Sequence, residues 1–154
     1  MSEQVIHNQQ YVGVYGIVQN GFGEVLLIQK TRGPYIGKLD LPGGKIEHGE
    51  EPLKALAREL REEVGIFVTD AVLIDNRSVT VLYDKNGEQI SFFHLGLVYA
   101  VRYDIAKGEK LDIVEQDVGG ASWNLVQSLD TEKLSPFAHF AVEYVRSKKE
   151  LILK

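Results

Sequence analysis

Hydrophobic residues in the first thirty positions cluster in two runs of strand length. Residues 11–19 and 24–29 are rich in valine, isoleucine, leucine and tyrosine, and the segment Asn20-Gly21-Phe22-Gly23 separates them. β-Branched and aromatic side chains favour strands, and an Asn-Gly pair between two strands is typical of a hairpin turn. The pattern therefore predicts a β-hairpin ahead of the middle of the chain.

The hydrophobic spacing changes to a helical period between residues 52 and 64. At 100° per residue, a set of apolar side chains falls on one narrow face of a helix. This stripe consists of Leu53, Leu56, Ala57, Leu60 and Val64. Pro52 suits the first turn of such a helix, and Gly65 suits the position just after its end. We expect a helix over residues 52–64 whose apolar stripe faces the core.

Strand-like sequence returns after this helix. Residues 67–76, 78–83 and 90–103 are rich in β-branched and aromatic residues, a turn is predicted at residues 84–87, and residues 119–123 suit a last short strand. The chain therefore has sheet structure on both sides of the central helix.

A second helix is predicted near the end of the chain. Ser135 suits its N-cap and Pro136 its first position, and it should reach about residue 149. Its apolar face consists of Phe137, Phe140, Ala141, Tyr144 and Val145. Strands interrupted by one helix and closed by another imply an α/β fold with a mixed sheet between helices. With 154 residues, 44% of them hydrophobic, we expect one domain over residues 1–154.

Composition narrows the classes of function. The net charge is −5 and no basic run exceeds Lys148-Lys149, which does not favour binding to a nucleic-acid backbone. The absence of cysteine excludes disulfides, thiolate catalysis and Cys-ligated zinc. No leader-like or membrane-length apolar run is present, so we expect a soluble, cytoplasmic protein without membrane contacts. The sequence leaves open whether it forms a homodimer.

Three glutamates share one flank of the predicted central helix. Glu59, Glu62 and Glu63 stand at positions i, i+3 and i+4. Their like charges repel, and a hard divalent cation such as Mg²⁺ resolves that repulsion. Arg58 lies beside Glu62 and Glu51 on the helical wheel, where its guanidinium fork can hold a carboxylate in one orientation.

A solvated acidic face with an ordinary i,i+4 ion pair is the alternative interpretation of this helix. The preceding residues Pro42-Gly43-Gly44 argue against it, because they form a tight loop that brings backbone groups beside the carboxylates. A glycine loop next to an acidic helix is what a metal and phosphate site needs.

The spacing of these glycines and charged residues resembles the Nudix box. The segment GKIEHGEEPLKALARELREEVGI, residues 44–66, carries every residue that the box fixes. These are Gly44, Glu50, Arg58-Glu59-Leu60, Glu62-Glu63 and Gly65-Ile66. The preceding residues 38–43, KLDLPG, look like the lead-in of the MutT-like branch. The resemblance implies the Nudix fold, an α/β/α sandwich with a mixed central sheet.

Members of that family hydrolyse a nucleoside diphosphate linked to another moiety. The resemblance therefore implies that water attacks a phosphorus of a pyrophosphate bridge. Glu59, Glu62 and Glu63 would hold Mg²⁺ or Mn²⁺ together with the backbone carbonyl of Gly43. Glu59 is the first candidate for the general base and Glu62 the second, and Arg58 completes the catalytic group in a positioning role.

Further candidate residues lie outside the helix. Glu115, with Asp117 as its rival, is a candidate for an additional metal ligand, or else a solubilising charge on a loop. Arg32 and Lys38 precede the box and are candidates for phosphate contacts, or else surface cations.

The MutT-like lead-in indicates a nucleoside triphosphate substrate, including an oxidised purine such as 8-oxo-dGTP, cleaved to the monophosphate and pyrophosphate. Gly44 and Lys45 are expected to contact it. MutT-like enzymes can read the oxidised base with an asparagine in the C-terminal region, where this chain has His139. His139 either replaces that contact or caps an aromatic cluster.

Two other functions are open on the sequence. One is a nucleotide-sensing regulatory domain of the same fold without turnover, and the other is a purely structural domain whose carboxylates bind no metal. The intact set of Glu59, Glu62 and Glu63 argues against the sensor, because a sensor needs neither a base nor a metal cluster.

Overall fold

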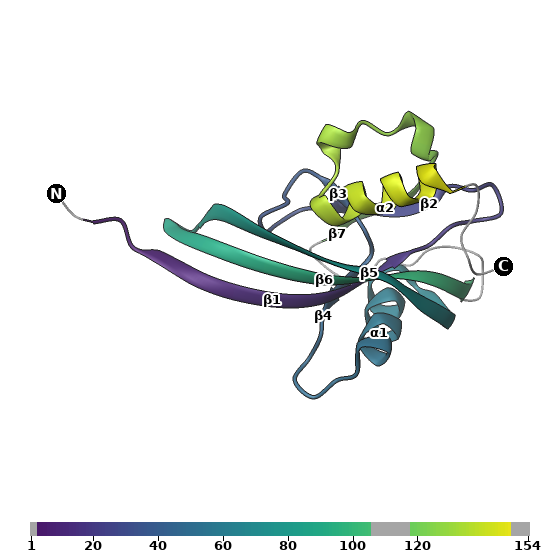
Figure 1. Cartoon of the computed structure of the whole chain (residues 1–154), viewed down its shortest axis with the longest axis horizontal. Helices are drawn as coiled ribbons and strands as arrows, with labels where there is room; N and C mark the ends of the chain where they lie inside the picture. Colours follow the sequence, from purple (N-terminus) through teal and green to yellow (C-terminus); the bar gives the residue numbers. More distant parts are fainter. Residues whose placement is uncertain (1–2, 106–117, 149–154) are drawn as a thin grey trace.

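The computed structural model describes residues 3–105 and 118–148 of the chain. One of its sheets has four strands in the order β4-β1-β6-β5 (Figure 1). These strands are β1 (Ile6–Ile17), β4 (Gly43–Lys45), β5 (Ile66–Lys85) and β6 (Glu88–Ile105). β1 and β6 are parallel, whereas β1–β4 and β5–β6 are antiparallel. The sheet is therefore mixed, as predicted.

A second sheet has three strands in the order β3-β2-β7. They are β2 (Val25–Lys30), β3 (Leu39–Asp40) and β7 (Val118–Asn124), and both pairs are antiparallel. β7 confirms the short strand predicted around residues 119–123.

The helices α1 (Pro52–Val64) and α2 (Pro136–Ser147) pack on opposite faces of the strands (Figure 1). Alternate residues of β2 divide between them: Leu26 packs in the α1 core, and Leu27 packs in the α2 core. Two 3₁₀ turns, η1 (Val126–Ser128) and η2 (Thr131–Lys133), precede α2. Within the described residues, neither helix is long and apolar enough to cross a membrane. The α/β/α sandwich is thus confirmed.

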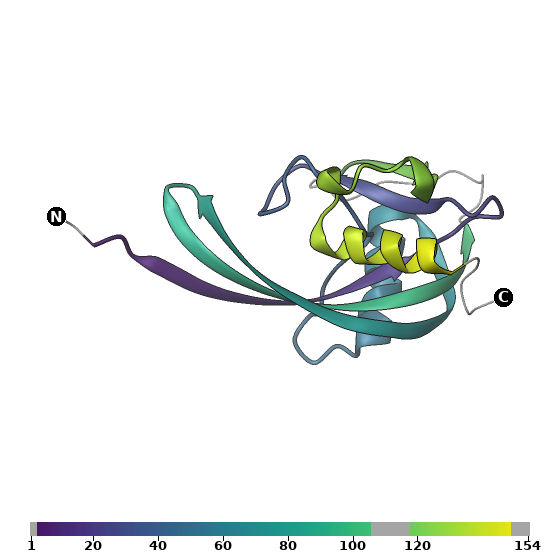
Figure 2. The same ribbon diagram turned by 45° about the horizontal axis from the view of Figure 1, so that its top comes forward.

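An arm of three strands extends beyond this sandwich (Figure 2). It contains the Ile6 end of β1 and the hairpin between β5 and β6, which turns at Asn86 and Gly87. Asn86 has a φ of 54° and Gly87 a φ of 86°, values that an Asn-Gly pair tolerates. The turn predicted at residues 84–87 is therefore confirmed.

The hairpin predicted between residues 11–19 and 24–29 forms only at its turn. The Asn20 side chain accepts hydrogen bonds from the backbone of Phe22 and Glu24, both at 3.0 Å. Beyond the bridge of Gln19 with Val25, β1 joins one sheet and β2 the other. The strands separate because β1 pairs with β6 and β4, whereas β2 pairs with β3 and β7.

The strands predicted at residues 67–76 and 78–83 are one continuous strand. Arg77 between them pairs with Gly96 of β6, so the ladder is not interrupted there. The register between β5 and β6 instead shifts at two earlier points, between Val68 and Asp70 and between Leu73 and Asp75.

The central helix has the predicted bounds, and Gly65 ends it with a φ of 71°. Its buried face differs from the predicted stripe, because Leu53 is 52% exposed and Ala55 is fully buried. The buried face is therefore rotated toward Ala55 and Glu63. This rotation carries one of the predicted metal-binding carboxylates into the interior.

The C-terminal helix begins as predicted, because the Ser135 hydroxyl accepts a hydrogen bond from the backbone N–H of Ala138 at 3.2 Å. It ends at Ser147. Its buried residues are Phe137, Ala138, Ala141, Val142 and Val145. Phe140 and Tyr144, which were expected on the apolar face, are only partly buried.

Candidate active site

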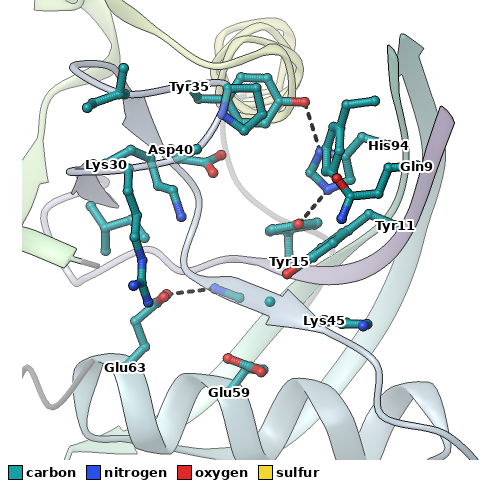
Figure 3. A pocket seen from close by; sticks show the side chains of 18 of the residues that line it. Gln9, Tyr11, Tyr15, Lys30, Tyr35, Asp40, Lys45, Glu59, Glu63 and His94 are labelled. Atoms are coloured by element: carbon teal, nitrogen blue, oxygen red, sulfur yellow. Dashed lines mark hydrogen bonds between the residues drawn. The ribbon is translucent and has the colours of Figure 1, made fainter. Parts of the chain in front are cut away.

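A cleft of about 910 Å³ lies between the two sheets, the start of the arm and α1 (Figure 3). One end is lined by the glutamates of α1 and the glycine loop. The other end is lined by aromatic side chains of β1, β6 and the loop after β2. The lining includes Tyr11, Tyr15, Lys30, Arg32, Tyr35, Asp40, Gly43, Gly44, Lys45, Arg58, Glu59, Glu62, Glu63, Phe92 and His94.

The three glutamates of α1 enter this cleft to different depths. The Glu63 residue is 3% exposed, whereas the side chains of Glu59 and Glu62 are 12% and 47% exposed. Glu63 Oε1 accepts a hydrogen bond from the backbone N–H of Gly43 at 2.9 Å (Figure 3). The helix and the glycine loop are thereby joined at their buried ends.

Burial raises the pKa of the Glu63 carboxyl well above its usual range, and the nearby carboxylates Glu59 and Asp40 raise it further. A divalent cation fits this donor set, because it would compensate the lost hydration and the mutual repulsion of Glu59 and Glu63. Within residues 3–105 and 118–148, no three acidic or histidine side chains already form a cation site. The ligand set therefore stays a prediction.

Arg58 ties the helix to the segment before it. Its Nε and Nη2 donate to the Glu50 carboxylate at 2.8 and 2.9 Å, and Nη2 also donates to the Lys45 carbonyl at 3.0 Å. Its Nη1 donates to Glu59 at 2.9 Å and to Glu62 at 3.3 Å. The Nη1 bonds hold Glu59 and Glu62 in place, and the bonds to Glu50 lower the pKa of its carboxyl to about 2.

The helical wheel indicated Glu51 as a partner of Arg58, but the structure shows Glu50 in that position. Glu51 is the N-cap residue, with an extended backbone (φ −70°, ψ 143°), so the geometry of the wheel does not apply to it. Glu50, which precedes the cap, is within reach of the guanidinium.

The two glycines of the loop are needed for close packing. Gly43 lies opposite Tyr15 in the β1–β4 pair and has a φ of 147°. A β-carbon built on Gly44 would meet Glu59 Oε2 at 2.5 Å. The loop therefore approaches the Glu59 carboxylate as closely as only glycine permits.

The aromatic end of the cleft centres on His94, which the sequence analysis did not single out. His94 is 3% exposed and stands between two tyrosine hydroxyls, Tyr15 at 2.6 Å from Nε2 and Tyr35 at 2.8 Å from Nδ1 (Figure 3). Burial, with a smaller effect of Lys30, lowers the pKa of His94 to about 3, so the ring is neutral. The sequence feature that could have identified His94 is its position: it continues the alternation of inward-facing residues at Ile90 and Phe92.

Three of the predicted substrate-binding residues, Arg32, Gly44 and Lys45, line the cleft. Two others do not. Lys38 donates to the backbone carbonyl of Glu132 at 3.2 Å, and His139 is exposed on α2, 3.8 Å from Glu143. The candidate ligands Glu115 and Asp117 lie outside the described residues.

Comparison with known proteins agrees with this geometry. The family model described as the NUDIX domain matches residues 9–145. The chain is 44% identical over 61 residues to an 8-oxo-dGTP diphosphatase of Haemophilus influenzae, a match that covers 39% of this chain and 45% of that protein. It is 38% identical over 81 residues to an 8-oxo-dGTP diphosphatase of Proteus vulgaris, covering 51% of this chain and 69% of that protein. The chain thus spans less than half the length of the Haemophilus relative.

The fold is also similar to that of a solved structure, the MutT NUDIX hydrolase of Burkholderia pseudomallei. The TM-score is 0.68 at 28% sequence identity, and the match covers 88% of this chain and 97% of that one. Because the family model spans both the acidic helix and the aromatic end of the cleft, this chain is a MutT-like member of the Nudix hydrolase family.

Proposed function

We propose that this chain hydrolyses the pyrophosphate bond of a nucleoside triphosphate, including one with an oxidised purine, to the monophosphate and pyrophosphate. The observation that carries the proposal is that a single cleft contains the acidic helix, cationic side chains and an aromatic wall. The similarity to 8-oxo-dGTP diphosphatases supports a purine nucleotide as the substrate class.

Glu59, Glu62, Glu63 and the carbonyl of Gly43 would hold Mg²⁺ or Mn²⁺. When bound, such an ion neutralises phosphate oxygens and lowers the pKa of water. The carboxylate oxygens of the buried end suit a hard cation of this kind.

In the reaction, the water oxygen forms a bond to phosphorus while the bridging P–O bond breaks. The bridging oxygen leaves with the bonding electron pair as part of pyrophosphate. Glu59 accepts the proton of the water, and Arg58 keeps that carboxylate oriented through the bond at 2.9 Å. Lys45 and Arg32, which line the cleft, offset phosphate charge.

The aromatic end suits the nucleobase. The ring centroids of Tyr11 and Phe92 are 5.6 Å apart, and those of Tyr11 and His94 are 5.0 Å apart. A planar nucleobase at this end would therefore meet several aromatic faces and edges. Both nitrogens of His94 are engaged by tyrosines. The imidazole therefore has no nitrogen left for a polar contact to the base.

The test is release of pyrophosphate or phosphate from a panel of canonical and oxidised nucleoside triphosphates, ADP-ribose, dinucleoside polyphosphates and nucleotide sugars, with Mg²⁺ or Mn²⁺. We expect metal-dependent hydrolysis with preference for a triphosphate. Removal of the ion with a chelator should abolish turnover, and its return should restore it.

Glu59→Gln should abolish turnover and leave the fold intact. Glu51→Gln is the matched control, because Glu51 is exposed and its side chain makes no capping bond. A folded wild-type protein that hydrolyses nothing in the panel contradicts the proposal and supports the sensing function instead.

A further inference from the structure

His94 links three parts of the chain that are distant in sequence. It belongs to β6, Tyr15 belongs to β1, and Tyr35 belongs to the loop of residues 31–38 between β2 and β3. All three residues are buried, with exposures of 3%, 4% and 6%. The Tyr35 ring also stacks on the imidazole, with centroids 5.6 Å apart and an interplanar angle of 21°.

The chemistry of a neutral imidazole makes this link directional. One ring nitrogen carries a proton and donates, and the other accepts. One tyrosine hydroxyl therefore donates to His94, and the other accepts from it. The neutral ring thus makes one bond as a donor and one as an acceptor, and a phenylalanine at position 94 can make neither.

The link reaches the acidic end of the cleft through β1. Tyr15 stands opposite Gly43 in the β1–β4 pair, and the Gly43 N–H is bonded to Glu63 at 2.9 Å. On the other side, the loop of residues 31–38 supplies Arg32, Gly33, Pro34 and Ile36 to the cleft wall. His94 thus stands between a loop that lines the cleft and β1, the strand that pairs with Gly43 and Gly44 of β4.

The backbone hydrogen bonds of this loop are mostly local. Ile36 donates to Gly33, Lys38 donates to Tyr35, and the loop closes where Gly37 donates to Lys30 at 3.0 Å. Such bonds shape the loop but do not fix it against β1 and β6. A buried side-chain bond from Tyr35 to the sheet does so.

We propose that His94 is a positioning residue that holds the loop of residues 31–38 against β1 and so sets the width of the cleft around the non-phosphate part of the substrate. This inference rests on the proposed function of the cleft. It concerns substrate affinity, since His94 does not touch the reacting atoms.

Tyr35→Phe tests the loop side of the link, and Tyr15→Phe tests the strand side. Tyr144→Phe is the matched control, because the Tyr144 hydroxyl is buried without a hydrogen-bond partner among the described residues. The first measurement is amide hydrogen exchange of residues 31–38 in the protein without substrate. We expect exchange to become about five- to tenfold faster in Tyr35→Phe and His94→Phe and to stay unchanged in Tyr144→Phe.

The second measurement separates KM from kcat for the best substrate of the panel. We expect KM to rise about five- to tenfold in Tyr35→Phe with kcat within twofold of wild type. Unchanged exchange of residues 31–38 in Tyr35→Phe overturns the proposal, and so does a fall in kcat without a change in KM. If the protein proves to hydrolyse nothing, the exchange measurement still decides the role of His94, and Tyr35→Phe decides it if His94→Phe does not fold.

Discussion

Gly44 and Glu59 are packed so closely that a β-carbon on the glycine would meet the carboxylate at 2.5 Å from Oε2 and 2.6 Å from Cδ. The backbone of the loop thus forms the surface against which the proposed base rests. Any side chain at position 44 must displace Glu59.

We expect Gly44→Ala to lower kcat/KM on the order of 10²-fold, because a displacement of about 1 Å at a reacting group costs that much. The control is Gly21→Ala, since a β-carbon at Gly21 meets nothing within 4 Å. Steady-state kinetics of both variants check the prediction, which fails if Gly44→Ala keeps wild-type activity.

Arg58→Lys removes the fork that holds Glu50, Glu59 and Glu62 together. A lysine ammonium cannot make the paired bonds to Glu50 and still reach Glu59. We expect kcat to fall about 10- to 100-fold, since the carboxylate loses its fixed orientation. Arg61→Lys on the same helix, whose guanidinium lies over the Phe67 ring, should keep full activity. Equal rates in the two variants would argue against a positioning role.

Lys45→Ala should raise KM about tenfold, because the side chain lines the cleft where phosphates are proposed to bind. Lys38→Ala is the matched control, since its ammonium bonds to the Glu132 carbonyl away from the cleft. Substrate titrations of both variants measure the effect. An equal rise in KM for Lys38→Ala would mean that net charge alone, and not position, governs affinity.

Ser135→Ala should destabilise the protein by about 2 kcal/mol. The hydroxyl caps α2 and also donates to the buried Asp40 carboxylate at 2.5 Å, so its loss removes a cap and leaves Asp40 with one partner fewer. Urea unfolding measures the free energy of unfolding. Ser128→Ala, at an exposed position of η1, is the control and should change it by less than about 0.5 kcal/mol.

His94 makes stability depend on pH. Its pKa is about 3 in the folded protein, mainly because of burial, against a usual value of about 6.5, so only the unfolded chain takes up a proton between these values. The stability is therefore fully present above about pH 6.5 and is lost as the pH falls toward 3. Relative to His94→Phe, the free energy of unfolding of the wild type should fall by about 1.4 kcal/mol per pH unit below 6.

The groups facing the His94 ring are Tyr11, Tyr15, Tyr35, Phe92 and Phe137, with Lys30 acting on its charge. Urea unfolding at several pH values compares the two proteins. His139→Gln, at an exposed histidine, should follow the wild-type profile. Parallel profiles of wild type and His94→Phe would show that the imidazole titrates normally in the fold.

The acidic end of the cleft could be predicted from the sequence because it is local. Helical periodicity alone brings Glu59, Glu62 and Glu63 to one flank, and the glycine loop lies directly before the helix. The buried depth of Glu63 could not be predicted, since it depends on a rotation of the helix that only packing against the sheets determines.

The aromatic end could not be predicted because no local period connects its members. Tyr15 and His94 meet through the parallel register of β1 and β6, and Tyr35 reaches them from a loop. The predictions that Lys38 and His139 contact the substrate were wrong for the converse reason. Their sequence neighbours enter the cleft or the core, but their own side chains point to other surfaces.

The cleft joins a contiguous segment, from Gly43 to Glu63, to a wall assembled from β1, β6, the loop of residues 31–38 and the arm. Substitutions at wall positions that do not contact the glycine loop can reshape what the cleft accepts while the residues proposed to act on the pyrophosphate stay in place. Selection can therefore alter the two halves separately. A family built this way can acquire new substrates through a few wall positions, such as Tyr11, Tyr35 and Phe92, while its chemistry is inherited unchanged.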